Sequence, residues 1–290
     1  MAAAAPVLVV AHAGSMGAVM DKGLGPAFAA SHHVDVHAIG RGSYGLAHLI
    51  AGKHKRPDVF IAITPGPIRI VQKAGLMAIA VPVASTQMVI AYSPKSRFAG
   101  QFKAAAKGDL PWYKVLEQKD LRFGRTDPRT DPQGRNIVLT MQLAQRFYQQ
   151  PHLVKRILGS ILNKRQIFTE ASLLTRLEAG QMDATSGYLS AVISHHLPYI
   201  KLPEEINLDN PAMMEKWYGH AGFELPGEGS GAATRVKVQP LVFYAGVLEN
   251  AARPALARQF IAFLQSAKGR KLLADYGYST AKGKALRPVD

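Results

Sequence analysis

Apolar segments that each lead into a helical pattern open the chain. Residues 7–10 form a short apolar run typical of a buried strand, and residues 34–39 alternate between apolar and polar side chains as a half-buried strand does. Residues 57–63 form a third, nearly continuous apolar run. Each run is followed by a turn that contains glycine, serine or proline, and then by apolar positions at helical spacing. This order predicts a parallel α/β sheet flanked by helices.

Two of these turns have the composition of an anion-binding site. Ser15 follows Gly14, and Ser43 follows Gly42, immediately before a helical pattern. A serine here is expected to be the helix N-cap, and the unpaired N–H groups of the first turn attract negative charge. Gly14 also lets the backbone approach a ligand closely. Because parallel strands end at one edge of an open sheet, we expect both serines to face one ligand, although capping alone explains either serine singly.

A second unit begins where this pattern changes. Residues 85–92 alternate like an extended strand that crosses between two domains. Asp131 and Pro132, an N-cap residue followed by proline at the first helical position, predict the start of a long helix. Another helix is predicted from Glu170, and a short strand from residues 183–188.

The chain is predicted to return to the first unit near Leu202. A strand and two helices follow, at residues 241–247, 255–265 and 269–276. The sequence therefore predicts two lobes with a ligand cleft between them. Lobe I comprises residues 1–86 and 202–290, and lobe II comprises residues 87–201.

Composition narrows the classes of partner. The chain has 290 residues, a formal net charge of +15 and no cysteine. A strong positive charge is typical of nucleic-acid binding, but lysine and arginine are spread along the whole length without a long basic block, so we predict no nucleic-acid partner. Dispersed positive charge still attracts small anions. The lack of cysteine excludes disulfides and thiolate metal sites.

Several of these segments occur in an order that resembles one family. They are 12–15, 42–43, 85–92, 131–134, 169–170, 187–192, 199–207 and 260–278. Together they resemble the molybdate/tungstate-binding substrate-binding proteins of ABC transporters, members of the extracytoplasmic solute-binding superfamily, over nearly the whole chain. The resemblance implies a two-lobed, type II periplasmic-binding-protein-like α/β fold, each lobe a sheet flanked by helices. It also implies a monomer outside the cytoplasm that closes on an oxyanion and delivers it to a membrane permease.

The start of the chain does not itself indicate export. It lacks the basic region and the long apolar segment of a secretory signal, so the extracytoplasmic location rests on the resemblance. No run approaches the roughly 18 apolar residues of a membrane span.

The resemblance further implies which residues bind the ligand. They are Gly14, Ser15, Ser43, Asp131, Gln133, Gly134, Glu170 and Tyr188. Hydroxyl and backbone N–H donors suit this ligand, because a fully deprotonated oxyanion accepts hydrogen bonds at every oxygen and donates none.

Asp131 and Glu170 allow two interpretations. In the branch of the family that adds carboxylate oxygens to tungstate, an Asp and a Glu bond the metal centre, and these two positions resemble that pair. A carboxylate beside a dianion otherwise repels it, and is tolerated only when it is protonated or serves a helix start. We favour ligation because both positions match the branch. Such a pair would discriminate against sulfate, whose sulfur cannot expand its coordination in this way.

The arginines near Asp131 also leave two interpretations open. Arg125, Arg129 and Arg135 either neutralise Asp127 and Asp131 or contact the ligand.

Other functions are predicted to be absent. The sequence has no nucleophile elbow, no phosphate-binding Gly-Lys-Ser/Thr loop and no zinc signature, so we predict a binding protein without cofactor or resident metal rather than an enzyme of similar fold. The histidine pairs 32–33 and 195–196 face different ways on a helix and are expected at the surface. There is no helix-turn-helix segment of a transcription regulator, and no adjacent tyrosines for iron. Sulfate or another small anion remains the alternative ligand.

Overall fold

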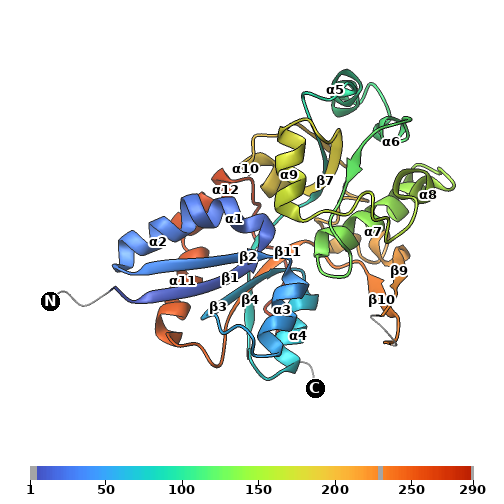
Figure 1. Cartoon of the computed structure of the whole chain (residues 1–290). Helices are drawn as coiled ribbons and strands as arrows, with labels where there is room; N and C mark the ends of the chain where they lie inside the picture. The colour runs from blue at the N-terminus through green and yellow to red at the C-terminus, as the bar shows by residue number, and fades with distance from the viewer. Residues whose placement is uncertain (1–4, 228–230, 289–290) are drawn as a thin grey trace. The chain divides into compact units, whose positions relative to one another are not determined.

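The computed structural model describes residues 5–227 and 231–288 of the chain (Figure 1). The chain divides into two compact units. Unit 1 comprises Met1–Thr86 and Leu241–Asp290, and unit 2 comprises Gln87–Pro240. The first division coincides with the predicted crossing near Thr86. The second falls between Pro240 and Leu241, and this corrects the predicted return near Leu202.

Unit 1 is built on a five-stranded sheet of order β2-β1-β3-β11-β4. Its strands are β1 (Val7–Ala13), β2 (Asp35–Arg41), β3 (Val59–Ile63), β4 (Ala80–Ser85) and β11 (Val242–Val247). As predicted, β1 runs parallel to both β2 and β3. The late strand β11 inserts antiparallel between β3 and β4, which makes the sheet mixed.

Helices cover both faces of this sheet. They are α1 (Gly17–Val19), α2 (Gly25–His32), α3 (Ser43–Ala51), α4 (Pro65–Lys73), α11 (Pro254–Gln265) and α12 (Ala267–Asp275). Figure 1 shows α2 on one face and α3 and α4 on the other. Leu46 of α3 and Ile68 of α4 belong to a buried cluster with Phe60 of β3. The ring of Phe28 meets that of Phe260 edge to face, which joins α2 to α11.

Unit 2 has a four-stranded sheet of order β6-β7-β5-β8 and a separate β9-β10 hairpin. The strands are β5 (Met88–Tyr92), β6 (Phe123–Gly124), β7 (Ala184–Tyr188), β8 (Tyr199–Lys201), β9 (Gly222–Leu225) and β10 (Thr234–Lys237). The helices are α5 (Ala99–Lys107), α6 (Trp112–Leu116), α7 (Pro132–Phe147), α8 (Leu153–Leu158), α9 (Glu170–Glu178) and α10 (Leu189–Ser194). Buried Val89, Leu173, Leu177 and Val192 form the core that joins β5, α9 and α10.

Polar contacts attach residues 203–240 to unit 2. The side-chain amide of Gln142 on α7 donates to the Gly222 carbonyl (3.2 Å) and accepts from the Gly222 N–H (2.9 Å). The Asn207 carbonyl accepts from the N–H of Met88 at the start of β5 (2.8 Å). The ring of Trp217 also packs on that of Phe147 on α7, and buried Ile206 and Phe223 lie in the same segment. Which unit such residues pack against depends on tertiary structure and is not marked by the local sequence pattern. The predicted boundary was therefore placed too early.

Candidate functional site

The two predicted serines lie at the same edge of the unit 1 sheet. β1 and β2 are paired in register, with His12 opposite Gly40 and Ala13 opposite Arg41, so both strands end together. Ser15 follows β1 in a single 3-10 turn, Gly14–Met16, and Ser43 is the first residue of α3. We call Ser15 and Ser43 the first half-site.

Neither serine is a helix cap, which corrects that part of the sequence interpretation. The N-cap positions belong to Ala13 and Gly42, and neither helix start has a side-chain cap hydrogen bond. Ser15 is 6% exposed and Ser43 1% exposed. Within the described residues, neither buried hydroxyl oxygen has a hydrogen-bond partner. A buried hydroxyl without a partner costs free energy, so two such groups at one sheet edge indicate donors kept for a ligand.

The turn that carries Ser15 is held by its neighbours. The Tyr278 hydroxyl donates to the Ser15 carbonyl (3.0 Å). The buried His12 ring donates from Nδ1 to the Ala13 carbonyl (2.8 Å) and lies over Gly40, where an added Cβ would be 2.8 Å from His12 Cε1. Burial lowers the pKa of His12, so the ring is neutral at neutral pH. His12 therefore supports the turn and carries no charge toward an anion.

Asp131 begins α7 as predicted. Its Oδ1 accepts from the N–H of Gln133 (2.8 Å), so that N–H is occupied by the cap and is not the free ligand donor that the sequence predicted. The Gln133 side chain is also engaged, because its Oε1 accepts from the Ser186 hydroxyl (3.0 Å). Asp131 is half-buried at this position.

Gly134 brings the preceding loop against the start of α7. A Cβ at Gly134 would be 2.4 Å from the Thr126 carbonyl oxygen and 2.7 Å from Pro128 N, both of which are backbone atoms. Only glycine allows this close approach. Gly134 thus fixes the loop that leads into Asp131.

Replacing Gly134 tests this close approach. We expect Gly134→Ala to lower the free energy of unfolding by about 1 to 3 kcal/mol, because the backbone must shift to admit the methyl group. The matched change Gly100→Ala places a methyl group in open space on α5, and helix propensity makes it neutral or slightly stabilising. Urea denaturation of both variants measures the difference. Equal stability of the two variants would contradict the role assigned to Gly134.

Glu170 has no capping role. The N-cap of α9 is Thr169, whose hydroxyl accepts from the Ser172 N–H (3.3 Å), and Glu170 is the first residue of the helix. Oε1 of Glu170 is buried and has no hydrogen-bond partner among the described residues. The dipole of α9 favours a negative charge at this end, but it does not explain a buried oxygen without a donor.

Asp131 and Glu170 lie near enough to interact. Burial, and secondarily the charge of Asp131, raises the pKa of Glu170 well above its ordinary value. Burial raises the pKa of Asp131 to about 6, against the opposing effects of the Gln133 N–H, the Thr126 side chain and the Arg135 charge. We use the name second half-site for these two carboxyl groups and Tyr188, which are residues of unit 2 that the sequence predicts to bind the ligand.

The raised pKa of Asp131 predicts a pH-dependent stability. The folded protein binds this proton more tightly than the unfolded chain, so stability is lost as pH rises from the ordinary value of 3.8 through about 6. Asp131→Asn keeps an N-cap and removes the charge. We therefore expect the free energy of unfolding of the ligand-free variant, relative to the wild type, to be about 1 to 3 kcal/mol higher at pH 7 than at pH 4.5. Denaturation of both proteins at the two pH values measures this effect.

Asp127 provides the opposite control. Burial alone would raise its pKa, but hydrogen bonds and charge from Arg129, with a contribution from Arg125, lower it. Asp127→Asn should therefore destabilise the protein to about the same extent at pH 7 and at pH 4.5, because a carboxyl group with a lowered pKa loses its stabilising effect only below the ordinary value of 3.8. An unchanged pH dependence in Asp131→Asn would contradict the burial assigned to Asp131.

Tyr188 ends β7 and is 1% exposed. Its hydroxyl accepts from Nδ2 of Asn136, one turn into α7 (3.0 Å). Sequence reasoning did not select Asn136, although it is a polar residue followed by five residues of α7 of which four are apolar. Asn136 links the strand that carries Tyr188 to the helix that Asp131 begins.

The arginines left open by the sequence have distinct partners. Arg129 donates to both carboxylate oxygens of Asp127, at 2.6 Å from Nη2 to Oδ2. Arg135 donates from Nε to the Pro128 carbonyl (2.7 Å). Arg125 is fully buried and donates to the carbonyls of Ser160 and Ile161. All three therefore hold loops of unit 2.

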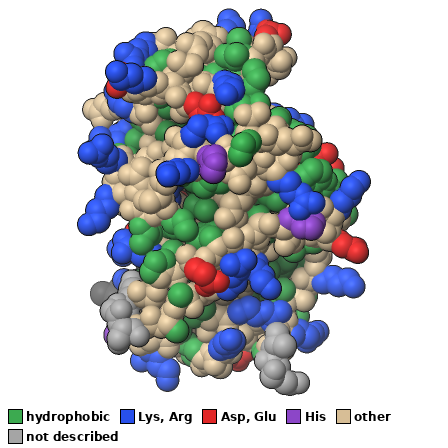
Figure 2. Space-filling view, turned by 90° about the vertical axis from the view of Figure 1, so that its right-hand side faces the viewer, with side chains coloured by type: hydrophobic (Ala, Val, Ile, Leu, Met, Phe, Trp, Pro, Cys, Tyr) green, Lys and Arg blue, Asp and Glu red, His purple; other side chains and the backbone are tan. Residues whose placement is uncertain are grey.

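Other features of the described residues bear on metal sites, membrane-spanning helices and basic patches. No three His, Cys, Asp or Glu side chains among them are placed to hold a metal ion. His195 pairs with Glu178 at the surface (2.9 Å). No helix within the described ranges is long and apolar enough to cross a membrane. Figure 2 shows lysine and arginine scattered over the face in view, without a single basic block.

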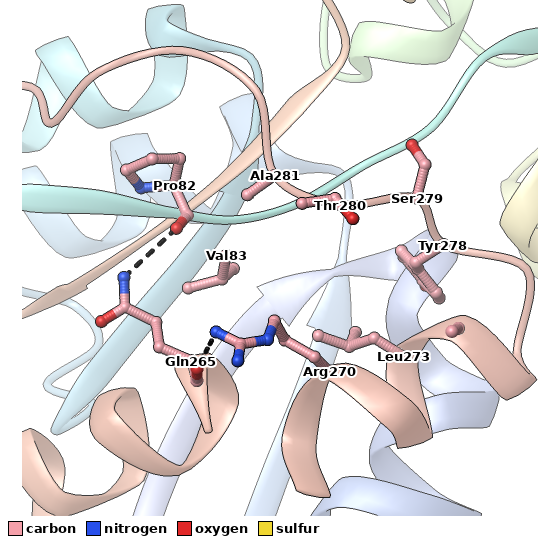
Figure 3. Close-up of a pocket in the computed structure, with 10 residues that line it drawn as sticks. Pro82, Val83, Gln265, Arg270, Leu273, Tyr278, Ser279, Thr280 and Ala281 are labelled. Atoms are coloured by element: carbon pink, nitrogen blue, oxygen red, sulfur yellow. Dashed lines mark hydrogen bonds between the residues drawn. The ribbon is translucent and has the colours of Figure 1, made fainter. Parts of the chain in front are cut away.

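Unit 1 also has a cavity of about 650 Å³ that contains none of the predicted ligand residues (Figure 3). It is lined by Pro82, Val83, Gln265, Arg270, Leu273, Ala274, Tyr278, Ser279, Thr280 and Ala281. Figure 3 shows the Gln265 side chain hydrogen-bonded to the Pro82 carbonyl and the Arg270 side chain hydrogen-bonded to the Gln265 carbonyl. Some of the polar groups that line the cavity therefore already have partners within the protein. Tyr278 connects this cavity to the Ser15 turn through its hydroxyl.

Comparisons with known proteins show which family and fold this chain resembles. The molybdate/tungstate-binding protein WtpA of Thermococcus kodakarensis is 30% identical over 211 residues, which cover 66% of this chain and 57% of that relative. The chain thus spans little more than half of the relative's length. Among solved structures, the Azotobacter vinelandii periplasmic molybdate-binding protein has a TM-score of 0.64 at 15% identity, covering 95% of this chain and 100% of that one.

A sulfate-binding protein has the same fold. SubI of Mycobacterium tuberculosis has a TM-score of 0.61 at 12% identity, covering 95% of this chain and 87% of that one. These likenesses confirm the predicted two-lobed α/β fold. A family model described as bacterial extracellular solute-binding protein matches residues 8–279. The chain therefore belongs to the bacterial extracellular solute-binding protein family.

Proposed function

We propose that this protein captures molybdate or tungstate outside the cytoplasm and delivers it to the membrane permease of an ABC transporter, acting as a monomer. The observation that carries the proposal is the pair of buried serine hydroxyls without partners at the ends of β1 and β2. Both can donate to an oxyanion, and the first turn of α3 adds N–H groups with a favourable dipole. The name of the Thermococcus relative, at 30% identity, supports the choice of ligand.

The second half-site favours a metal oxyanion over sulfate. Glu170 has a buried oxygen that no donor in residues 5–227 and 231–288 satisfies, and its carboxyl group interacts with that of Asp131. Molybdenum and tungsten can accept additional carboxylate oxygens, whereas sulfur cannot. We propose that both half-sites serve one ligand, with Tyr188 as a further hydroxyl donor.

A binding role fits the serines better than catalysis does. Within the described residues, neither hydroxyl is hydrogen-bonded to a histidine or carboxylate that could take its proton. The nearby His12 directs Nδ1 to the Ala13 carbonyl instead. A serine without an adjacent base is a weak nucleophile, so we propose that the protein binds its ligand without converting it and without a cofactor.

Calorimetric titration tests the proposal. Protein unfolded, dialysed and refolded to remove ligand is titrated separately with molybdate, tungstate, sulfate and phosphate. We expect micromolar to nanomolar affinity for molybdate or tungstate, about 8 to 12 kcal/mol, and little response to sulfate or phosphate. Tighter binding of sulfate than of molybdate or tungstate would indicate that sulfate, the alternative ligand, is the one captured. No binding of any of the four anions would contradict an oxyanion site.

A further inference from the structure

Arg125 is a charged residue placed inside unit 2. It directly follows β6 and is 0% exposed. Its Nη2 donates to the carbonyls of Ser160 and Ile161, both at 2.8 Å, and its Nε donates to Oε1 of Gln166 (3.2 Å). Burial of a guanidinium group is costly unless its hydrogen bonds are specific. The acceptors that offset this cost all lie on the loop between α8 and α9.

The backbone of Arg125 holds the same loop. Its N–H donates to the Gln166 carbonyl (2.7 Å), and its carbonyl accepts from the Phe168 N–H (3.0 Å). The Gln166 amide then donates to the Ile157 carbonyl at the end of α8 (2.8 Å). Residues 159–169 are thus fixed to Arg125 near both ends, at residues 160–161 and 166–168.

The two chain segments next to Arg125 lead to the two carboxyl groups. Along the chain, Arg125 is followed by the loop that packs on Gly134 and ends at Asp131. Across the bridge to Ile167, the other segment continues to the α9 start at Glu170. The position of one carboxyl group relative to the other therefore depends on Arg125.

We propose that Arg125 is a positioning residue that sets the Glu170 carboxyl group opposite Asp131 and so determines the selectivity for a metal oxyanion. It acts through the loop 159–169 and does not contact the ligand. This inference rests on the proposed function in one respect, because it takes Glu170 to contact the ligand.

The test is a double-mutant cycle with Arg125→Lys and Glu170→Gln, read by tungstate titration. Lysine keeps the charge but has a single donor nitrogen, which cannot replace both Nη2 at the two loop carbonyls and Nε at Gln166, so we expect Arg125→Lys to weaken tungstate binding at least about tenfold. In the Glu170→Gln background, Arg125→Lys should alter tungstate affinity less than about threefold, because the carboxyl group that Arg125 positions is already absent. If the two substitutions instead weaken tungstate binding independently, so that their fold-changes multiply in the double variant, the inference is overturned.

Arg156→Lys is the matched control. Arg156 lies on α8 and donates to Glu117 and to the Pro151 carbonyl, away from both helix starts. It should leave tungstate affinity unchanged, and an equal loss in both arginine variants would overturn the inference.

Hydrogen exchange separates this inference from the proposed function. If Arg125 fixes the loop, amides 160–170 in ligand-free Arg125→Lys should exchange at least about tenfold faster than in the wild type, while those of α5 stay unchanged. A uniform increase over unit 2 would overturn the inference. Should Arg125→Lys fail to fold, Gln166→Ala removes only the Nε acceptor and the Ile157 contact, and must show the same local increase. Failure of the wild type to bind tungstate would instead contradict the proposed function and leave this exchange test intact.

Discussion

The double variant Ser15→Ala, Ser43→Ala is expected to lose tungstate binding by more than a hundredfold and to be at least as stable as the wild type without ligand. A hydrogen bond to a charged oxyanion contributes about 1.5 to 3 kcal/mol, so two lost donors remove about 3 to 6 kcal/mol of binding free energy. In the ligand-free protein both hydroxyls are buried and have no partner in the part of the chain that the structure describes, so their removal relieves a desolvation cost of about 1 kcal/mol each. Calorimetric titration and thermal unfolding measure the two effects.

A third serine provides the control. Ser96 is buried, but its hydroxyl donates to Oδ1 of Asp183 (2.7 Å). Ser96→Ala should therefore lower stability and leave tungstate affinity unchanged. If the double variant instead loses stability as Ser96→Ala does and keeps its affinity, Ser15 and Ser43 are structural and the first half-site is not a binding site.

Glu170→Gln is expected to reduce tungstate affinity at least about tenfold while raising the stability of the ligand-free protein at pH 7. Glutamine has the same shape but is a poorer ligand for a metal centre. It also carries no charge, so the cost of ionising a buried carboxyl group whose pKa is raised disappears. Titration with tungstate and urea denaturation at pH 7 measure the two changes.

Glu178→Gln, at the other end of α9, is the control for that change. Glu178 pairs with His195 at the surface, where an ion pair contributes little. It should change neither affinity nor stability appreciably. Unchanged tungstate binding in Glu170→Gln would show that Glu170 does not bond the ligand, and would leave the serines to account for capture.

The fold was predictable where local patterns are strong. The alternation of strand and helix gave β1, β2 and β3 with the correct parallel direction, and the Asp131-Pro132 pair marked the start of α7 at the residue observed. The second boundary was not predictable, because the segment before Pro240 is attached to α7 and β5 by contacts between residues far apart in the sequence, among them the Phe147–Trp217 ring pair and the Gln142–Gly222 hydrogen bonds. Such contacts depend on tertiary structure and leave no periodic signal.

The positions of the candidate site residues in the fold were predictable from the sequence, but the local hydrogen bonding of each residue was not. The sequence placed Ser15 and Ser43 at the correct sheet edge, yet assigned them caps that Ala13 and Gly42 occupy. It predicted Asp131 as the N-cap of α7, which the hydrogen bond from the Gln133 N–H confirms, but it could not show whether the carboxyl group also contacts a ligand. Nor could it separate Glu170 from an ordinary first-turn glutamate, because that distinction rests on burial of one oxygen.

The most direct test of the central claim is the position of tungsten in a crystal of the tungstate complex, located by anomalous scattering at the tungsten edge. We expect one strong tungsten peak, with the oxygens of the tungstate ion within hydrogen-bond distance of the Ser15 and Ser43 hydroxyls and with Glu170 bonded to the metal. A peak remote from both serines, or no peak from a saturated solution, would contradict this expectation.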